Sequence, residues 1–182
     1  MHHDLRNEGK TMSRLTNNAM HLAMRAHGSQ VRKYTQEPYW KHCAEVVALT
    51  QSVTNDEEML AAAWLHDTLE DTDLARTTIY ERFGARVFEL VQGLTEVPVA
   101  GNRAVRKAAE CDRLASQCPA VQTIKYADLI SNTGSIVAHD PGFSQVYLGE
   151  KSALLLRLTQ GSPCLRALAW HTLNTSLTKL AA

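Results

Sequence analysis

The stretch from Met59 to Thr72 reads MLAAAWLHDTLEDT, and it decides the fold class of this chain. Its first seven residues are all apolar, which predicts a helix over Met59–Glu70 that is too apolar to be exposed. The four residues directly before it, Asn55-Asp56-Glu57-Glu58, resemble a capping box that opens a helix. We therefore expect this segment to be the central helix of a helical protein.

The end of this apolar segment carries four ionisable side chains within six residues: His66, Asp67, Glu70 and Asp71. Burying them would be costly unless a metal ion or other partners compensated for the lost solvation. On a helix, Glu70 lies four residues from His66 and three from Asp67, and Asp71 lies four from Asp67. All four side chains can therefore converge on one quadrant, which predicts a functional site.

Helix signals recur on both sides of this segment, and no run of alternating β-branched residues bounded by turns stands out. A first helix is expected over Ser13–His27, with Ser13 as its N-cap and Gly28 at its end. The other helix starts and breaks are expected at Pro38, Gly84, Pro98–Asn102, Arg103, Pro119, Asp140-Pro141 and Ser162-Pro163. The predicted fold is all-α, a single compact helical bundle over residues 1–182 with residues 1–12 as a frayed terminus.

Charge and composition narrow the possible partners. Lys and Arg number 19, as do Asp and Glu, so the formal net charge is zero and nothing in the bulk charge attracts nucleic acid or a membrane surface. No apolar run approaches the roughly 20 residues that span a bilayer. The four cysteines form no C-x-x-C pair, and no signal-like segment precedes them. We expect a cytoplasmic protein with free thiols that binds no membrane and no nucleic acid.

Two further residues are candidates to complete a metal site. A histidine beside a carboxylate, as in His66-Asp67, suits Mn²⁺, Fe²⁺ or Zn²⁺, but two ligands are too few to hold the ion. His42 lies on the preceding predicted helix. Asp128 is the lone acid in the otherwise mostly apolar stretch 124–130, and a buried lone aspartate needs a cation.

Six ordered blocks carry a family resemblance: Ala26-His27-x-x-Gln30-x-Arg32-Lys33, Pro38-Tyr39-x-x-His42, His66–Thr72, Phe83-Gly84, Leu90–Thr95 and Ala127–Asn132. The chain resembles the HD superfamily, whose pattern is H…HD…D. It is most similar to the (p)ppGpp hydrolase domain of the RelA/SpoT alarmone enzymes and to the stand-alone small alarmone hydrolases. The resemblance spans roughly residues 19–158, and six blocks in order are far more specific than a bare His-Asp dipeptide.

The resemblance implies a role for each matching residue. One divalent metal ion, expected to be Mn²⁺, would be bound by His42, His66, Asp67 and Asp128. Glu70, with Asp71, would orient a water molecule and take its proton. The substrate contacts would be Arg32, Lys33 and Asn132. The implied reaction removes the 3′-pyrophosphate of an alarmone nucleotide, (p)ppGpp or (p)ppApp, and leaves a nucleoside 5′-di- or triphosphate.

Departures from the family pattern leave the substrate open. Cys43 and Leu129 replace a proline and a basic residue that are common in the long bifunctional enzymes, and the loop 32–38 lacks their glycine. Nothing in the sequence distinguishes guanine from adenine. One alternative is another HD nucleotide phosphohydrolase, a nucleotidase or an NADPH 2′-phosphatase. Another is a non-catalytic nucleotide-sensing module, which predicts a lost ligand or a lost water-activating acid.

Several polar residues receive no single role from the sequence. The basic residues of one predicted helix could contact a 5′-phosphate or form a solvated face, and three histidines have no identified partner. The oligomeric state is likewise open. The residues concerned are Arg103, Arg106, Lys107, His21, His139 and His171.

Overall fold

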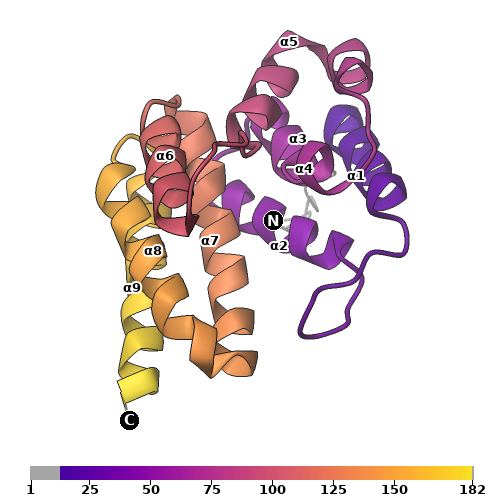
Figure 1. Ribbon diagram of the computed structural model, residues 1–182. Coiled ribbons are helices and arrows are strands. Elements are labelled where there is room, and N and C mark those ends of the chain that lie inside the picture. Colours follow the sequence, from indigo (N-terminus) through magenta and orange to yellow (C-terminus); the bar gives the residue numbers. More distant parts are fainter. Residues whose placement is uncertain (1–12, 182) are drawn as a thin grey trace, which may run out of the picture.

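The apolar segment that decides the fold class is the central helix α3, Glu57–Leu65 (Figure 1). Every side chain from Met59 to Leu65 is buried, because α1, α2 and α5 pack around this helix. Asp56 is its N-cap and accepts hydrogen bonds from the backbone N–H groups of Glu58 and Met59 at 3.0 and 3.2 Å. The cap starts the helix two residues earlier than predicted.

The computed structural model describes residues 13–181, and this part of the chain contains nine helices and no strand. The predicted all-α class is therefore confirmed. The predicted frayed terminus, residues 1–12, lies outside the described residues. None of the described helices combines the length and the apolar character needed to cross a bilayer. The remaining helices are α1 (Arg14–His27), α2 (Trp40–Gln51), α4 (Thr68–Asp71), α5 (Arg76–Leu94), α6 (Arg103–Ala115), α7 (Pro119–His139), α8 (Pro141–Arg157) and α9 (Pro163–Ala181).

Local signals predicted most helix ends correctly. Ser13 caps α1, and Gly28 ends it with a positive φ of 51°. Gly84, with φ 84° and ψ 174°, interrupts α5 with a kink at the predicted break. Asp140 caps α8 by accepting a hydrogen bond from the backbone N–H of Phe143. These positions depend on backbone conformation and capping within a few residues, which is why sequence signals suffice.

The second helix begins later than predicted. Pro38 was expected at its first position, but α2 starts at Trp40. The loop before it pairs with itself instead: Val31 and Pro38 form an isolated antiparallel bridge, in which the Arg32 N–H donates to the Glu37 carbonyl at 2.8 Å. This pairing holds Pro38 in the loop, so that the helix can begin only after Tyr39.

Helix α7 joins the two sides of the molecule. It packs against α2, α3 and α5, and also against α6, α8 and α9. Figure 1 shows α1 to α5 gathered on one side of α7 and α6, α8 and α9 on the other. Since α7 packs against α2 and α3, its buried polar side chain Asp128 lies close to these two helices. This contact assembles the candidate site.

Candidate active site

The predicted helix Met59–Glu70 is wrong at its C-terminal end, where the chain breaks between α3 and α4 at His66 and Asp67. Side chains take over the last carbonyl groups of α3: His66 Nδ1 bonds to the Ala63 carbonyl at 2.9 Å, and Thr68 Oγ1 donates to the Leu65 carbonyl at 2.7 Å. Such side-chain bonds compete with the regular helix ladder. The four ionisable residues therefore do not lie on one continuous helix.

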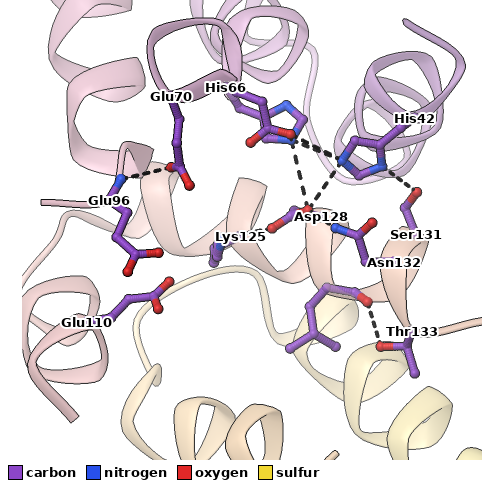
Figure 2. Close-up of polar contacts among 12 residues, drawn as sticks. His42, His66, Glu70, Glu96, Glu110, Lys125, Asp128, Ser131, Asn132 and Thr133 are labelled. Atoms are coloured by element: carbon purple, nitrogen blue, oxygen red, sulfur yellow. Dashed lines mark hydrogen bonds and ion pairs between the residues drawn. The ribbon is translucent and has the colours of Figure 1, made fainter. Parts of the chain in front are cut away.

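The two histidines of the site direct the same ring atom toward each other. His42 on α2 and His66 after α3 are both buried, and their Nε2 atoms lie 3.2 Å apart (Figure 2). The Nδ1 atom of His66 faces a backbone carbonyl, which can only accept, so Nδ1 carries the proton. The Nε2 atom of the neutral ring therefore carries a lone pair that is available to a metal ion.

Carboxylate oxygens complete this cluster. Asp67 Oδ2 lies 2.9 Å from His66 Nε2 and 3.5 Å from His42 Nε2. Asp128 Oδ1, on α7, lies 3.4 Å from His42 Nε2 and 3.9 Å from His66 Nε2. Ligand atoms that share one ion at about 2.0–2.2 Å lie roughly 3–4 Å from one another. The ligand atoms of His42, His66 and Asp128 all lie within 4.8 Å of one another, which fits a divalent metal site.

The electrostatics of the cluster favour a cation. Burial lowers the pKa of His42, but hydrogen bonds and charge from Asp128 and Asp67 outweigh it and raise this pKa to about 9. Burial raises the pKa of Asp67, whereas the neighbouring His66 and His42 hold it well below its ordinary value. Both carboxylates are therefore ionised, and the field that favours a proton on His42 equally favours a metal ion.

Neighbouring side chains hold Asp128 and Asp67 in place. Lys125 Nζ lies 2.7 Å from Asp128 Oδ2, and Asn132 Nδ2 donates to Asp128 Oδ1 at 2.6 Å (Figure 2). The Tyr39 hydroxyl donates to Asp67 Oδ2 at 2.7 Å. Burial alone would raise the pKa of Asp128, but the Lys125 ammonium lowers it below its usual value. Lys125 thus occupies one oxygen of Asp128 and leaves the other directed at the histidines.

The two predicted catalytic acids lie at the edge of the cluster. Glu70 Oε2 accepts a hydrogen bond from the Glu96 backbone N–H at 3.0 Å, and burial raises the pKa of Glu70 (Figure 2). Asp71 Oδ2 accepts from Gln30 Nε2 at 3.3 Å, and Gln30 Oε1 in turn meets His27 Nδ1 at 2.8 Å. The His-x-x-Gln block thus orients Asp71.

A cavity of about 220 Å³ connects these groups. Its lining includes Asp67, Asp128, Glu70, Asp71 and Asn132, so the structure brings five predicted site residues to one space. His42 and His66 lie behind the carboxylates and are buried. A larger cavity of about 780 Å³, between residues 53–59, 86–90, 117–123 and Ser162, contains none of the predicted site residues. Volume alone therefore does not identify the site.

Three lysines also line the cavity of 220 Å³: Lys107, Lys125 and Lys151. Lys107 pairs with Glu96 at 3.3 Å and with Glu110 at 2.5 Å. Lys151 Nζ lies over the Tyr147 ring, 5.4 Å from its centroid, and has no carboxylate within ion-pair distance in the described part of the chain. Burial lowers the pKa of Lys151. Sequence reasoning missed Lys125 and Lys151, because a lysine on a mostly apolar helix gives no sign of the cavity that it faces.

Arg32 and Lys33, the predicted substrate contacts of the loop, lie outside the lining of this cavity. The Arg32 side chain is buried and donates to Glu45 Oε2 at 3.0 Å and to the Ser131 carbonyl at 3.1 Å. Lys33 is exposed and donates to the Tyr34 hydroxyl at 3.1 Å. The structure thus brings Asn132, but neither basic residue, to the cavity.

The residues left open by the sequence have separate surroundings. Arg103 forms two hydrogen bonds with Glu150, at 2.6 and 2.9 Å, whereas Arg106 donates to the Gly101 carbonyl. Of the basic residues on α6, Lys107 is the one that faces the metal cluster's cavity. His139 Nδ1 bonds to the Ser135 carbonyl, and His21 and His171 are exposed.

Comparison with protein families matches the chain to the HD domain over residues 19–126. The match covers more than half of the chain, and the chain therefore belongs to the HD-domain family. Within it, the chain is related to the (p)ppGpp hydrolase domains of the RelA/SpoT type, as the ordered motif blocks predicted. The buried cluster of His42, His66 and Asp128 is consistent with the divalent metal site typical of this family.

Two relatives illustrate the relationship. A GTP pyrophosphokinase of Brucella ovis is 36% identical over 124 residues, which cover 65% of this chain and 16% of that protein. A guanosine-3′,5′-bis(diphosphate) 3′-pyrophosphohydrolase of Aquifex aeolicus is 47% identical over 79 residues, 43% of this chain and 11% of that protein. The chain thus spans only a small part of the length of either relative.

Two solved structures share the fold. A metazoan ortholog of SpoT that hydrolyses ppGpp superimposes with a TM-score of 0.80 at 23% identity, over 92% of this chain and 96% of that one. A protein from Listeria monocytogenes EGD-e superimposes with a TM-score of 0.65 at 22% identity, over 78% of this chain and 96% of that one. The identities are low, so these similarities establish the helical architecture alone.

Proposed function

We propose that this protein is a metal-dependent pyrophosphohydrolase that removes the 3′-pyrophosphate of an alarmone nucleotide. The products would be pyrophosphate and a nucleoside 5′-di- or triphosphate. The observation that carries the proposal is the cavity in which the two candidate ligand carboxylates, four further acids and three lysines meet. The relative from Aquifex aeolicus, a guanosine-3′,5′-bis(diphosphate) 3′-pyrophosphohydrolase, supports the choice of substrate.

The proposed ligands of the divalent metal are His42, His66, Asp67 and Asp128. A divalent cation bound there supplies Lewis acidity toward a phosphate and lowers the pKa of a water molecule. We favour Mn²⁺, since a mixed set of imidazole and carboxylate ligands suits it. The raised pKa of Glu70 fits a proton acceptor, because the best general base has a pKa near the working pH. Asp71, oriented by Gln30, would assist it.

The lysines indicate an anionic substrate. Lys151 is a half-buried cation over the Tyr147 ring, with no carboxylate within ion-pair distance in the described residues, and a bound anion would stabilise such a group. Lys107 lies opposite on α6 and is already paired with two glutamates. A cavity of about 220 Å³ is smaller than a typical site for a whole ligand, about 300–1,000 Å³. We therefore expect it to receive the pyrophosphate end, with the base and ribose outside.

A second candidate is a phosphomonoesterase that acts on a nucleotide or on the 2′-phosphate of NADPH, since the same metal ligands would serve it. A non-catalytic sensing module is the third, but the four ligand candidates and both acids are all present. Neither guanine nor adenine is favoured by any contact in the described structure, so ppGpp and ppApp are both candidate substrates.

The experiment incubates Mn²⁺-loaded protein with ppGpp, ppApp, NADPH and a nucleoside monophosphate, and resolves pyrophosphate from orthophosphate. A His66→Ala variant purified in parallel controls for contaminating phosphatases. The proposal expects pyrophosphate from at least one alarmone with the wild-type protein and none with the variant. Orthophosphate from NADPH or the monophosphate, without pyrophosphate from either alarmone, would favour the second candidate. No turnover of any of the four would favour the sensing module.

A further inference from the structure

The Nδ1 atom of His42 points away from the ligand cluster, toward a chain of polar side chains from three different elements. It lies 2.8 Å from Ser131 Oγ on α7. Figure 2 marks this contact with a dashed line. The Ser131 hydroxyl donates to Glu45 Oε2 on α2 at 2.5 Å. Arg32, from the loop before α2, donates to that same Glu45 oxygen at 3.0 Å and to the Ser131 carbonyl at 3.1 Å.

The direction of these hydrogen bonds decides which nitrogen carries the proton in the neutral, metal-binding form of His42. A carboxylate can only accept, so the Ser131 hydroxyl donates its single hydrogen to Glu45. Its oxygen is then an acceptor toward His42, and the imidazole must donate from Nδ1. The Nε2 atom of the neutral ring then carries a lone pair, which faces His66, Asp67 and Asp128.

Arg32 fixes the orientation of this row of hydrogen-bonded side chains. Its guanidinium joins α2 to α7 through Glu45 and the backbone of Ser131, and its side chain is 9% exposed whereas that of Glu45 is 48% exposed. An exposed carboxylate by itself has several accessible rotamers, but the buried guanidinium favours the one that accepts from Ser131. The Arg32 guanidinium thus lies on the Nδ1 side of His42 and does not line the cavity.

We propose that Ser131, Glu45 and Arg32 form a positioning network that holds His42 with its proton on Nδ1 and its Nε2 atom available to the metal. The inference rests on the proposed function in that it requires the metal site, and only the comparison of KM values for Arg32→Ala requires a substrate. Partners of this kind orient a metal-bound imidazole and typically contribute about 10–100-fold to metal affinity or activity. For Arg32, this role replaces the substrate contact predicted from the sequence.

The test measures the Mn²⁺ affinity of metal-stripped protein by titration calorimetry, without substrate. Ser131→Ala should weaken binding about tenfold, and Ser131→Thr, which keeps a hydroxyl group, should restore most of the affinity. Ser135→Ala, one turn further along α7 and also half-buried, is the matched control and should bind Mn²⁺ like the wild type. Arg32→Ala should weaken Mn²⁺ binding and leave the KM for the substrate unchanged at saturating Mn²⁺.

The proposed role of the network is refuted if Ser131→Ala binds Mn²⁺ as tightly as the wild type, or if Ser131→Thr binds Mn²⁺ as weakly as Ser131→Ala. An increased KM in Arg32→Ala with unchanged Mn²⁺ affinity would restore Arg32 as a substrate contact and overturn its positioning role. Circular dichroism spectra check that each variant folds, and Arg32→Lys replaces Arg32→Ala if the latter does not. Failure of the alarmone assay would leave these affinities as they are, so that the two proposals fail separately.

Discussion

Replacing Glu70 by glutamine tests the proposed proton acceptor with little disturbance of the fold. Glu70 Oε2 accepts the Glu96 backbone N–H at 3.0 Å, and the amide oxygen of glutamine can accept the same bond. The two side chains are nearly equal in size, so α4 keeps its link to the end of α5. What the variant loses is the ability to take a proton from water.

The expected effect follows from what a positioned base contributes. General base catalysis typically supplies about 10²–10⁴ in rate, so Glu70→Gln should lower kcat by that factor. This corresponds to about 2.7–5.4 kcal/mol of transition-state stabilisation. The Mn²⁺ content and the KM should remain close to the wild-type values, because Glu70 contacts none of the proposed metal ligands by any described hydrogen bond.

The pH dependence gives a second signature. Burial raises the pKa of Glu70 above 4.5, although the Glu96 N–H and the charge of Lys125 oppose the shift. A base acts only when ionised, so kcat should fall as the pH decreases through this raised pKa, on a limb above pH 4.5. The limb should be absent from any residual activity of Glu70→Gln, since glutamine does not titrate.

The assay measures steady-state kinetics and Mn²⁺ content on the same preparations, with Glu81→Gln as the matched control. Glu81 is exposed on α5 and lies outside the cavity lining, so its substitution should change neither quantity. If Glu70→Gln loses Mn²⁺ together with its activity, Glu70 is a metal ligand and the proposed role is refuted. Full turnover in Glu70→Gln would refute it equally.

Two further predictions concern the metal ligands and the packing of the bundle. Asp67→Ala should lose most of the bound Mn²⁺, measured by atomic emission, because Asp67 Oδ2 lies 2.9 Å from His66 Nε2 at the proposed metal site. Equal metal content in the wild type and in Asp67→Ala would mean that the site is wrongly assigned. Gly161→Ala should lower the free energy of unfolding in urea by about 1–3 kcal/mol, because its new Cβ would lie 2.6 Å from Tyr126 Cε2 and 2.8 Å from the Thr123 nitrogen. Gly149→Ala, with no atom within 4 Å of the new Cβ, should not be destabilised, and equal urea midpoints for the two variants would contradict this packing argument.

Local patterns in the sequence were enough to predict the all-α class, the central apolar helix and most helix ends. These features depend on periodicity, capping and glycine conformation over a few neighbouring residues. Ser13, Gly84 and Asp140 each act locally and lie where the pattern predicted. The metal-ligand candidates could also be named from the sequence, because a histidine and acids in apolar surroundings are costly without a cation.

The surroundings of those ligand candidates depend on how distant segments pack in the folded protein. The break after Leu65 depends on hydrogen bonds that His66 and Thr68 make with the end of α3, and a periodic pattern does not show them. The direction of Arg32 depends on Ser131, which is 99 residues away in the sequence. Long charged side chains adopt the orientation that their distant partners allow, so that the position of a lysine or arginine in the chain does not reveal whether it faces the cavity or the back of a ligand.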